Sequence, residues 1–478
     1  MALFFKWLFR IVIGVTTLAL LAGYMAYYLG SRSLPDYSAS YEVSGITGAI
    51  EIARDTANVP HIFGENDADV FYGLGFAHAQ DRLFQMMLLR RTAQGKLSEV
   101  FGERTKNTDI LMRHLGVYEA AVASAPLQTP ETTAALKAYA RGVNAWIGEV
   151  NKGAMGRGAP EFFLFPSEIA YWRPEDSIAL LKLVALRLSD HIPSEVLRAR
   201  TSLMLPEERV KDILPDAPGA PTALLGGFAA LFPDVSPYTP EAGVDYAMAG
   251  FNPSPLGGAS NVWAASPDRA ASGASLMAND PHLGFSAPGA WYLARVELQT
   301  GGVIGATIPG IPFVVAGRKD MLSWGVTSAY TDDADLYIEQ VNPAAADEVM
   351  TPEGYKKMRS KPSILRIKDQ PPETLTLQWT DNGPVLPQTA FDLNTVTPNG
   401  HVVSVSWTPL AHDDTSLSAL MRLMQAQTVR QGLEAGRSFV APALNLALAD
   451  PEHIAQKTIG RAPIRDAAHQ SQGRIPSA

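Results

Sequence analysis

The chain has 478 residues, of which 46% are apolar and 18% charged, which is enough apolar sequence to build a large core. It contains no cysteine, which excludes disulfides, cysteine-ligated zinc and a cysteine nucleophile. The net charge is −9 and no basic block stands out, so the composition argues against nucleic acid as the main partner.

The N-terminal segment has the pattern of a membrane-targeting helix. Lys6 and Arg10 precede residues 11–29, which carry no charge, and tyrosines gather at the outer end of this stretch. A membrane span needs about 20 apolar residues, and aromatic residues favour the membrane interface. We interpret residues 1–30 as an uncleaved signal anchor that leaves the rest of the chain exported. A cleaved signal peptide is the alternative, and a buried core helix is a third.

The next region, residues 31–214, reads as mainly helical. A polar linker over 31–44 comes first, and short alternating runs within 50–63 predict strands. Apolar residues that recur at every third and fourth position predict helices over 67–99, 129–151 and 174–200.

The pattern changes near the middle of the chain. Residues 215–259 are rich in proline, glycine and alanine, which is typical of a linker or spacer. In the remaining region, 260–478, short apolar runs predict strands over 261–265, 275–278, 291–299, 303–307, 313–317, 323–328, 364–367, 374–379 and 402–407. Helices followed by many strands indicate an α+β fold with one layered core.

Ser260 is the candidate nucleophile. It follows Gly257-Gly258-Ala259 and precedes an apolar, strand-like run. If the 259–260 bond is cut, the α-amine of Ser260, with a pKa of about 8, can act as the base for its own hydroxyl. The sequence has no G-x-S-x-G elbow and no H-E-x-x-H motif, so other hydrolase routes lack support. By its spacing alone, however, a serine in this pattern is more often a loop residue entering a strand than a nucleophile.

Sequence blocks in order along the chain resemble those of the penicillin acylase (penicillin amidase) family, whose members are N-terminal-nucleophile hydrolases. The blocks are DTANVPHIFG at 55–64, GLGFAHAQDRLFQM at 73–86, RTAQGKLSE at 91–99, SNVW at 260–263, NDPHL at 279–283, WGVTSAYTDDAD at 324–335 and APALN at 441–445. The resemblance extends over roughly residues 44–466. It implies a four-layer αββα sandwich, which we expect to be incomplete because the region after Ser260 is shorter than the family's usual β-chain.

The resemblance also implies an activity. The chain would be a zymogen that cuts itself between Ala259 and Ser260, and its processed chains would stay associated as a heterodimer. It would then hydrolyse a linear amide of a small N-acyl substrate, such as a β-lactam side chain or an acyl-homoserine lactone, through an acyl-enzyme on Ser260. We expect an inner-membrane anchor with the hydrolase region in the periplasm, or secretion to the periplasm after signal cleavage.

The resemblance assigns roles to four further residues. His282 would orient Ser260, and its backbone would assist the oxyanion. Ser328 would give a backbone N–H, and Asn445 its side-chain amide, to the oxyanion hole. Arg465 matches an arginine near the family's active site. Taken singly, these residues are equally a loop histidine, a turn asparagine and a surface arginine.

Carboxylates at residues 332–335 suggest a structural Ca²⁺, because hard oxygen ligands suit that ion. An isolated acidic loop is usually just solvated. The resemblance implies one calcium ion held by Asp332, Asp335, the Ala334 carbonyl and Glu195.

The resemblance places an acyl pocket at residues that are smaller and more aliphatic than in phenylacetyl-selective members. The smaller residues are Val184, Leu188, Leu283 and Ala316, and the fifth pocket residue, Arg187, keeps the identity it has in the family. We expect a roomier pocket that takes aliphatic or mixed acyl groups, with ordinary core packing as the alternative. A non-catalytic, membrane-tethered relic that acts as an interaction module is the alternative function.

Overall fold

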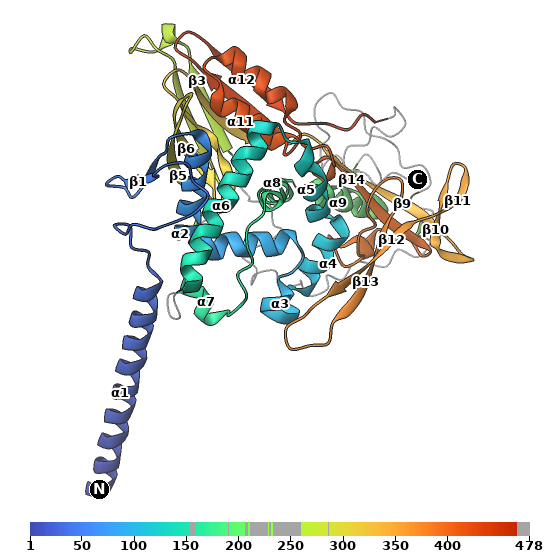
Figure 1. Cartoon of the computed structure of the whole chain (residues 1–478). Helices are drawn as coiled ribbons and strands as arrows, with labels where there is room; N and C mark the ends of the chain where they lie inside the picture. Colours follow the sequence, from blue (N-terminus) through green and yellow to red (C-terminus); the bar gives the residue numbers. More distant parts are fainter. Residues whose placement is uncertain are drawn as a thin grey trace.

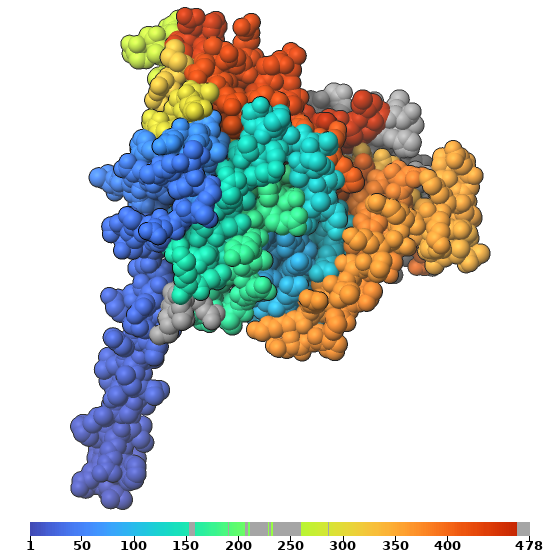
Figure 2. Space-filling view, in the orientation of Figure 1, coloured from blue at the N-terminus to red at the C-terminus, as the bar shows by residue number. Residues whose placement is uncertain are grey.

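The computed structural model describes residues 1–152, 158–189, 191–205, 209–210, 228, 231–232, 260–284 and 286–465. The predicted spacer, 215–259, lies outside the described residues except at 228 and 231–232. Helix α1 (Ala2–Ser33) stands away from the body as an exposed rod (Figures 1 and 2). By length and composition α1 could cross a membrane. A signal sequence passes the same test, so the choice between anchor and signal peptide stays a prediction.

The first helical layer is built on α2 (Asp67–Ala93) and α6 (Pro130–Lys152). Asn66 caps α2 by accepting a hydrogen bond from the Asp69 N–H. The two helices approach closely through reciprocal glycines. A Cβ on Gly75 would lie 2.2 Å from the Tyr139 carbonyl oxygen, and one on Gly142 would lie 1.9 Å from that of Tyr72. Only glycine permits this contact, so the pair fixes how α6 lies on α2.

Further helices complete the layer: α3 (Ser98–Phe101), α4 (Lys106–Leu115), α5 (Val117–Ser124), α7 (Glu161–Leu164), α8 (Pro174–Leu188), α9 (His191–Met204), α11 (Ser416–Gln425) and α12 (Val429–Ala435). The predicted 67–99 helix ends early because Gly95 takes a left-handed φ of 60°. The prediction of one helix over 174–200 was wrong. Ser189 is extended, and α9 restarts with Pro193 in its first turn, where a proline lacking an N–H is tolerated.

The helices cover one face of an eight-stranded sheet (Figure 1). Its order is β1 (Glu51–Arg54), β2 (Pro60–Phe63), β5 (Tyr292–Leu298), β6 (Gly301–Ile308), β7 (Ile311–Arg318), β8 (Ser323–Ser328), β15 (Leu444–Ala449) and β16 (Ile454–Ile459). Neighbours are antiparallel except β2 and β5. The sheet thus joins strands from both sides of the spacer, which confirms the mixed α+β prediction.

The opposite face of this sheet carries a hairpin of β3 (Ser260–Ala265) and β4 (Leu276–Pro281), which packs on β8 and β15. Apolar side chains around the hairpin stay exposed. Trp263 is 56% exposed, Leu293 54% and Met321 50%. A groove of about 800 Å³ runs between β4 and the sheet. Among the described residues this face is therefore only partly covered.

A second group of strands extends from the body (Figure 1). One antiparallel sheet has the order β11 (Gly354–Lys357), β10 (Ala345–Thr351), β9 (Ala334–Asn342) and β14 (His401–Trp407). A separate hairpin joins β12 (Arg359–Leu365) to β13 (Glu373–Trp379) and lies against α4. The sequence predicted β12, β13 and β14, but neither β9–β11 nor β15 and β16.

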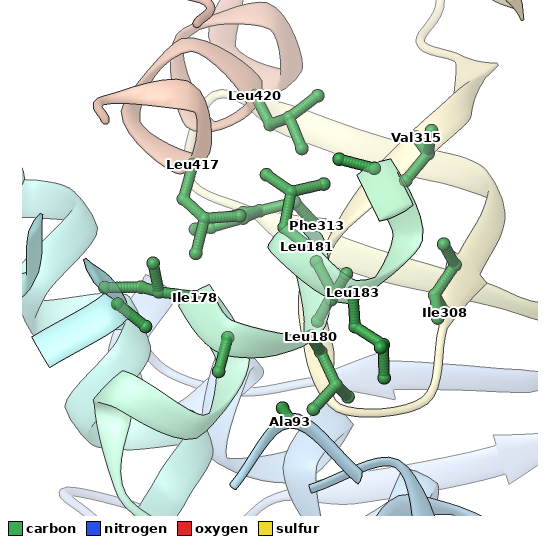
Figure 3. Close-up of a cluster of buried hydrophobic side chains, with 14 of the residues drawn as sticks. Ala93, Ile178, Leu180, Leu181, Leu183, Ile308, Phe313, Val315, Leu417 and Leu420 are labelled. Carbon is green, nitrogen blue, oxygen red and sulfur yellow. The ribbon is translucent and has the colours of Figure 1, made fainter. Parts of the chain in front are cut away.

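Helix α8 is the central element of the core. Figure 3 shows its leucines pointing between α11 and the strands of the main sheet. The buried Lys182 of α8 donates to the Asp414 carboxylate at 2.8 Å and to the Pro409 carbonyl at 2.7 Å. Burial lowers the pKa of Lys182, and the Asp414 charge opposes that effect. This ion pair fixes α8 to the segment that leads into α11.

His78 of α2 forms a polar link between the helices and the sheet. One ring nitrogen contacts the Tyr139 hydroxyl at 2.7 Å and the other contacts Thr307 Oγ1, on β6, at 2.9 Å. His78 is fully buried, and this burial lowers its pKa from 6.5 to about 3. The histidine is therefore neutral in the folded chain throughout the range in which an unfolded histidine takes up a proton.

We predict that His78 makes the fold sensitive to acid. Between pH 6.5 and 3 the unfolded state binds a proton that the folded state does not. The free energy of unfolding should thus fall by about 1.4 kcal/mol per pH unit from this group as the pH is lowered. Denaturant titrations at pH 7, 6 and 5 should show a shallower decline in His78→Gln than in the unchanged chain. Equal slopes in the two proteins would contradict this assignment.

Candidate active site

Ser260 is the first residue of β3 and the first described residue after the spacer. In the β3–β4 ladder it lies opposite Pro281, and Asn261 lies opposite Asp280. The hairpin rests on β8, the strand that ends at Ser328. The hairpin thus brings together the sequence blocks SNVW and NDPHL, and it places both beside β8, which carries the start of the WGVTSAYTDDAD block.

Ser260 and Ser328 line the same cavity, of about 110 Å³. Its walls are mostly apolar and come from α8, the sheet and α11. They include the predicted Val184, Arg187, Leu188 and Leu283, together with Leu180, Leu183, Trp291, Ile308, Val315, Val326, Leu420 and Phe439. The structure therefore places the candidate nucleophile on the lining of a mostly apolar cavity, as such sites require.

Arg187 is the charged residue of this wall. Burial lowers its pKa from the ordinary arginine value. A guanidinium stays protonated in proteins, so the cavity keeps one positive charge beside its apolar surface.

Two expectations about the pocket differ from the structure. Ala316 lines the groove on the opposite face of the sheet, not the cavity. Side chains alternate along a strand, so Val315 faces the cavity in its place. The cavity is also small rather than roomy, at about 110 Å³.

The cavity lies where β7 and β8 part. Their ladder pairs Gly317 with Trp324 and Arg318 with Ser323 and does not continue beyond these pairs. If the ladder continued, Ala316 would pair with Gly325 and then Val315 with Val326. Val315 and Val326 line the cavity instead. The parted strands therefore form the cavity wall and leave the Val326 peptide without a strand partner on that side.

Ser328 directs its N–H toward the same side as Val326. In an antiparallel ladder, alternate residues point their N–H and C=O groups at the same neighbour. The Ala329 N–H bonds to the Ala443 carbonyl, on the β15 side. By alternation, the Ser328 N–H faces away from β15 and toward the hairpin that carries Ser260. This orientation is the one that an oxyanion donor needs.

Asn445 of β15 lies beside Ser328. Its Nδ2 contacts Thr327 Oγ1 and the Ser328 carbonyl, both at 3.4 Å, while its Oδ1 accepts a hydrogen bond from Thr458 at 2.8 Å. Contacts at 3.4 Å are at the long limit for hydrogen bonds. The Thr458 bond fixes the amide orientation, and Nδ2 is held only loosely.

His282 is oriented away from the cavity. Its Nε2 lies 2.6 Å from Asp280 Oδ2, and both side chains are about half exposed. Hydrogen bonding from His282 lowers the pKa of Asp280. Within the described part of the chain no hydrogen bond joins His282 to Ser260, and the expected orienting role stays a prediction.

Arg465 lies on the predicted calcium ligands, outside the residues that line the cavity. It bonds both carboxylate oxygens of Asp335 at 2.9 Å and contacts Asp332 Oδ1 at 3.2 Å. The buried Glu195 accepts from the Leu336 N–H, while its Oε1 has no hydrogen-bond partner among the described residues. Burial, and then the charge of Asp335, raise the pKa of Glu195 well above its ordinary value.

The carboxylate and carbonyl oxygens of this cluster suit a hard cation as ligands. The Glu195 oxygen that lacks a partner among the described residues is consistent with such a site. Ala334, whose carbonyl is the fourth expected ligand, is buried at the start of β9. Among the described residues, however, no three acidic or histidine side chains are gathered closely enough to hold a metal ion. In this arrangement the Arg465 guanidinium neutralises the carboxylates.

Asn279 is a residue to which the sequence assigned no role. Its side-chain amide bonds both to Val326 of β8 and to the Asn261 carbonyl of β3. The only signal in the sequence was its place in the NDPHL block, where an asparagine before Asp-Pro reads as a turn residue.

The chain resembles known proteins over most of its length. The family model described as penicillin amidase matches residues 49–478. An acyl-homoserine lactone acylase (QuiP) of Pseudomonas aeruginosa is 29% identical over 93% of this chain and 53% of its own length. A penicillin acylase 2 proenzyme of Pseudomonas sp. strain SE83 is 30% identical over 87% of this chain and 53% of its own length. Penicillin G acylase of Escherichia coli is 28% identical over 84% of this chain and 52% of its own length.

A solved structure, the thermostable penicillin G acylase of Alcaligenes faecalis, is 23% identical over 43% of this chain and 36% of its own, with a TM-score of 0.39. That score is too low to support an argument about the fold. The chain spans about half the length of the curated relatives it matches. The family match covers most of the sequence, including every block around Ser260, and the chain therefore belongs to the penicillin amidase family, a family of linear-amide hydrolases.

Proposed function

We propose that the chain is the precursor of an exported amide hydrolase whose nucleophile is Ser260. Self-cleavage between residues 259 and 260 would free the serine amine, and the two products would stay associated through the shared main sheet. The observation that carries this proposal is that Ser260 and Ser328 line the same apolar cavity. Strand alternation from the Ala329–Ala443 hydrogen bond turns the Ser328 N–H away from β15, which supports its role as an oxyanion donor. Residue 259 lies outside the described residues. The free-standing α1 supports a membrane anchor with the body in the periplasm.

The proposed chemistry is acyl transfer in two steps. The Ser260 hydroxyl oxygen attacks the amide carbonyl carbon, and its proton passes to the α-amine. The Ser328 N–H and Asn445 Nδ2 stabilise the oxyanion. The C–N bond then breaks, and the leaving amine takes the proton. Water attacks the resulting Ser260 ester, which releases the carboxylic acid and restores the hydroxyl.

The cavity favours a slim aliphatic acyl group. A cavity of about 150 Å³ is known to hold one benzene ring, and this one is about 110 Å³. The walls supplied by Val184, Leu188 and Leu283 are aliphatic. A short linear acyl chain therefore fits with less rearrangement than a phenylacetyl group. We propose N-acyl amides of that kind, such as acyl-homoserine lactones, as substrates in preference to phenylacetyl β-lactams.

This family places the whole sheet core in an αββα sandwich, of which the β3–β4 hairpin would supply the start of the second sheet.

The first test is self-cleavage of the purified chain. Mass spectrometry should find two fragments that separate before Ser260, and a single intact chain in Ser260→Ala. Ser266→Ala removes a serine next to the other end of the same strand and should cleave like the unchanged protein. An uncleaved chain without activity would contradict the proposal and favour the alternative, a membrane-tethered interaction module.

The same cleaved protein tests the acyl preference. Hexanoyl anilide should have a higher kcat/KM than phenylacetyl anilide, because a poorly fitting group loses about 1–3 kcal/mol, or 10- to 200-fold. A clear preference for phenylacetyl would contradict the proposed substrate class.

We further propose that Ca²⁺ competes with Arg465 for the carboxylates of Asp332, Asp335 and Glu195, with the Ala334 carbonyl as a fourth ligand. The bound ion would supply the positive charge that the guanidinium otherwise provides. The Arg465 contacts are largely buried, with 15% and 4% of the Arg465 and Asp335 side chains exposed. The neighbouring Arg461–Asp413 pair is exposed at 48% and 62% and serves as a matched control.

Thermal and denaturant unfolding can test this competition. In chelator, Arg465→Met should lower the free energy of unfolding by roughly 3–5 kcal/mol, because it leaves buried carboxylates unpaired. Arg461→Met should cost at most about 1 kcal/mol. Millimolar calcium should restore stability to Arg465→Met alone. Unfolding of Arg465→Met that does not respond to calcium would rule out the proposed ion.

A further inference from the structure

The β3–β4 hairpin is joined to the main sheet by one side-chain amide. Asn279 of β4 accepts a hydrogen bond from the Val326 N–H through Oδ1 at 3.2 Å. Its Nδ2 donates to the Val326 carbonyl at 3.1 Å and to the Asn261 carbonyl at 2.9 Å. The amide therefore binds the peptide groups of β8 as a neighbouring strand would, and it also holds the residue that follows Ser260.

This contact lies where β7 leaves β8. The β7–β8 ladder includes Trp324 but not Val326, so the Val326 peptide would otherwise have no strand partner on that side. An unsatisfied pair of buried backbone groups costs about 1–3 kcal/mol per group. Asn279 supplies both missing partners, and so lets the strands part and the cavity exist.

Gly325 gives the amide its space. A Cβ on Gly325 would lie 2.9 Å from Asn279 Cβ, 3.0 Å from its Cγ and 3.0 Å from Val262 Cγ2. Contacts that close force a shift of the neighbouring atoms. The hairpin can therefore approach β8 only where the sheet carries a glycine.

We propose that Asn279 is a positioning residue that sets the distance between the Ser260 hydroxyl and the Ser328 N–H. Asn261 follows the nucleophile directly, and Val326 precedes Ser328 by two residues on the same strand. One rigid amide thus joins the backbone beside the nucleophile to the backbone beside the oxyanion donor. The inference rests on the proposed function, because it concerns how that reaction is aligned.

The structure offers a matched control. Asn144 of α6 forms the same kind of clamp elsewhere, accepting from the Trp172 N–H at 2.6 Å and donating to the Trp172 carbonyl at 2.9 Å. Asn144→Ala thus removes a comparable clamp in the helical layer. A purely structural role for Asn279 predicts that the two alanine variants behave alike.

The experiment measures self-cleavage, steady-state kinetics and melting temperature in Asn279→Ala, Asn279→Asp and Asn144→Ala. Misplacing reacting groups by about 1 Å can cost 10²-fold in rate. We expect Asn279→Ala to lower the cleavage rate and kcat by roughly 10- to 100-fold with KM little changed. The near-isosteric Asn279→Asp keeps the acceptor but replaces the donor with a carboxylate oxygen that faces two carbonyl oxygens. It should lower the cleavage rate and kcat at least as much as Asn279→Ala. Asn144→Ala should lower the melting temperature and leave the rates unchanged.

Hydrogen exchange separates failure of this inference from failure of the proposed function. The Val326 amide should exchange faster in Asn279→Ala than in the unchanged chain, whether or not the protein cleaves. Unchanged exchange would overturn the clamp. Normal rates in Asn279→Ala, in a protein that is otherwise active, would overturn the positioning role. If the protein without substitutions neither cleaves itself nor hydrolyses amides, the proposed function is overturned. The exchange rate of the Val326 amide still shows whether Asn279 holds that peptide.

Discussion

The parting of β7 from β8 is the constraint on which the candidate site depends. Two strands that are paired at Gly317 and Trp324 separate within the next two residues, and the apolar cavity lies in the opening. A sheet can part in this way only if the exposed peptide groups find other partners. Here the Asn279 amide provides them, and the same side chain brings the Ser260 hairpin against the strand that ends at Ser328.

The helical layer holds this opening in shape. Helix α8 supplies one wall of the cavity and is fixed by the Lys182–Asp414 ion pair. His78 of α2 joins β6 through Thr307 and α6 through Tyr139, with one hydrogen bond to each. Both links connect sequence before the spacer to sequence after it. A cut between residues 259 and 260 would therefore leave the two parts joined by the sheet, the ion pair and the histidine contacts. The far face of the sheet, with Trp263 and Leu293 more than half exposed, is only partly covered by the described residues.

The sequence predicted the elements whose pattern is local. Helix α2, helix α6 and strands β3 to β8 follow from apolar periodicity, and Ser260, Ser328 and Leu283 could be expected to meet because motif blocks carried them. Strands β9 and β15 do not stand out in the sequence, because β9 begins inside an acidic run and β15 is a short apolar segment of leucine and alanine, residues that are as common in helices. Ala316 lines the groove and Val315 the cavity, because alternation along β7 decides which face a residue reaches and only the strand register reveals it.

Two relations could not be read from the sequence at all. The carboxylates of Asp332 and Asp335 predicted a cation, but nothing local showed that Arg465, far along the chain, would bind them. The role of Asn279 depends on the separation of two other strands, and no residue pattern marks where an antiparallel ladder stops.

A high-resolution crystal structure of the Ser260→Ala precursor tests the central claim most directly. The account predicts that β7 and β8 separate after the Gly317–Trp324 pair, that the Asn279 amide binds the Val326 peptide, and that residue 260 lies at the cavity mouth beside the Ser328 N–H. A structure in which Val315 pairs with Val326 and closes the cavity, with Asn279 turned to solvent, would contradict it.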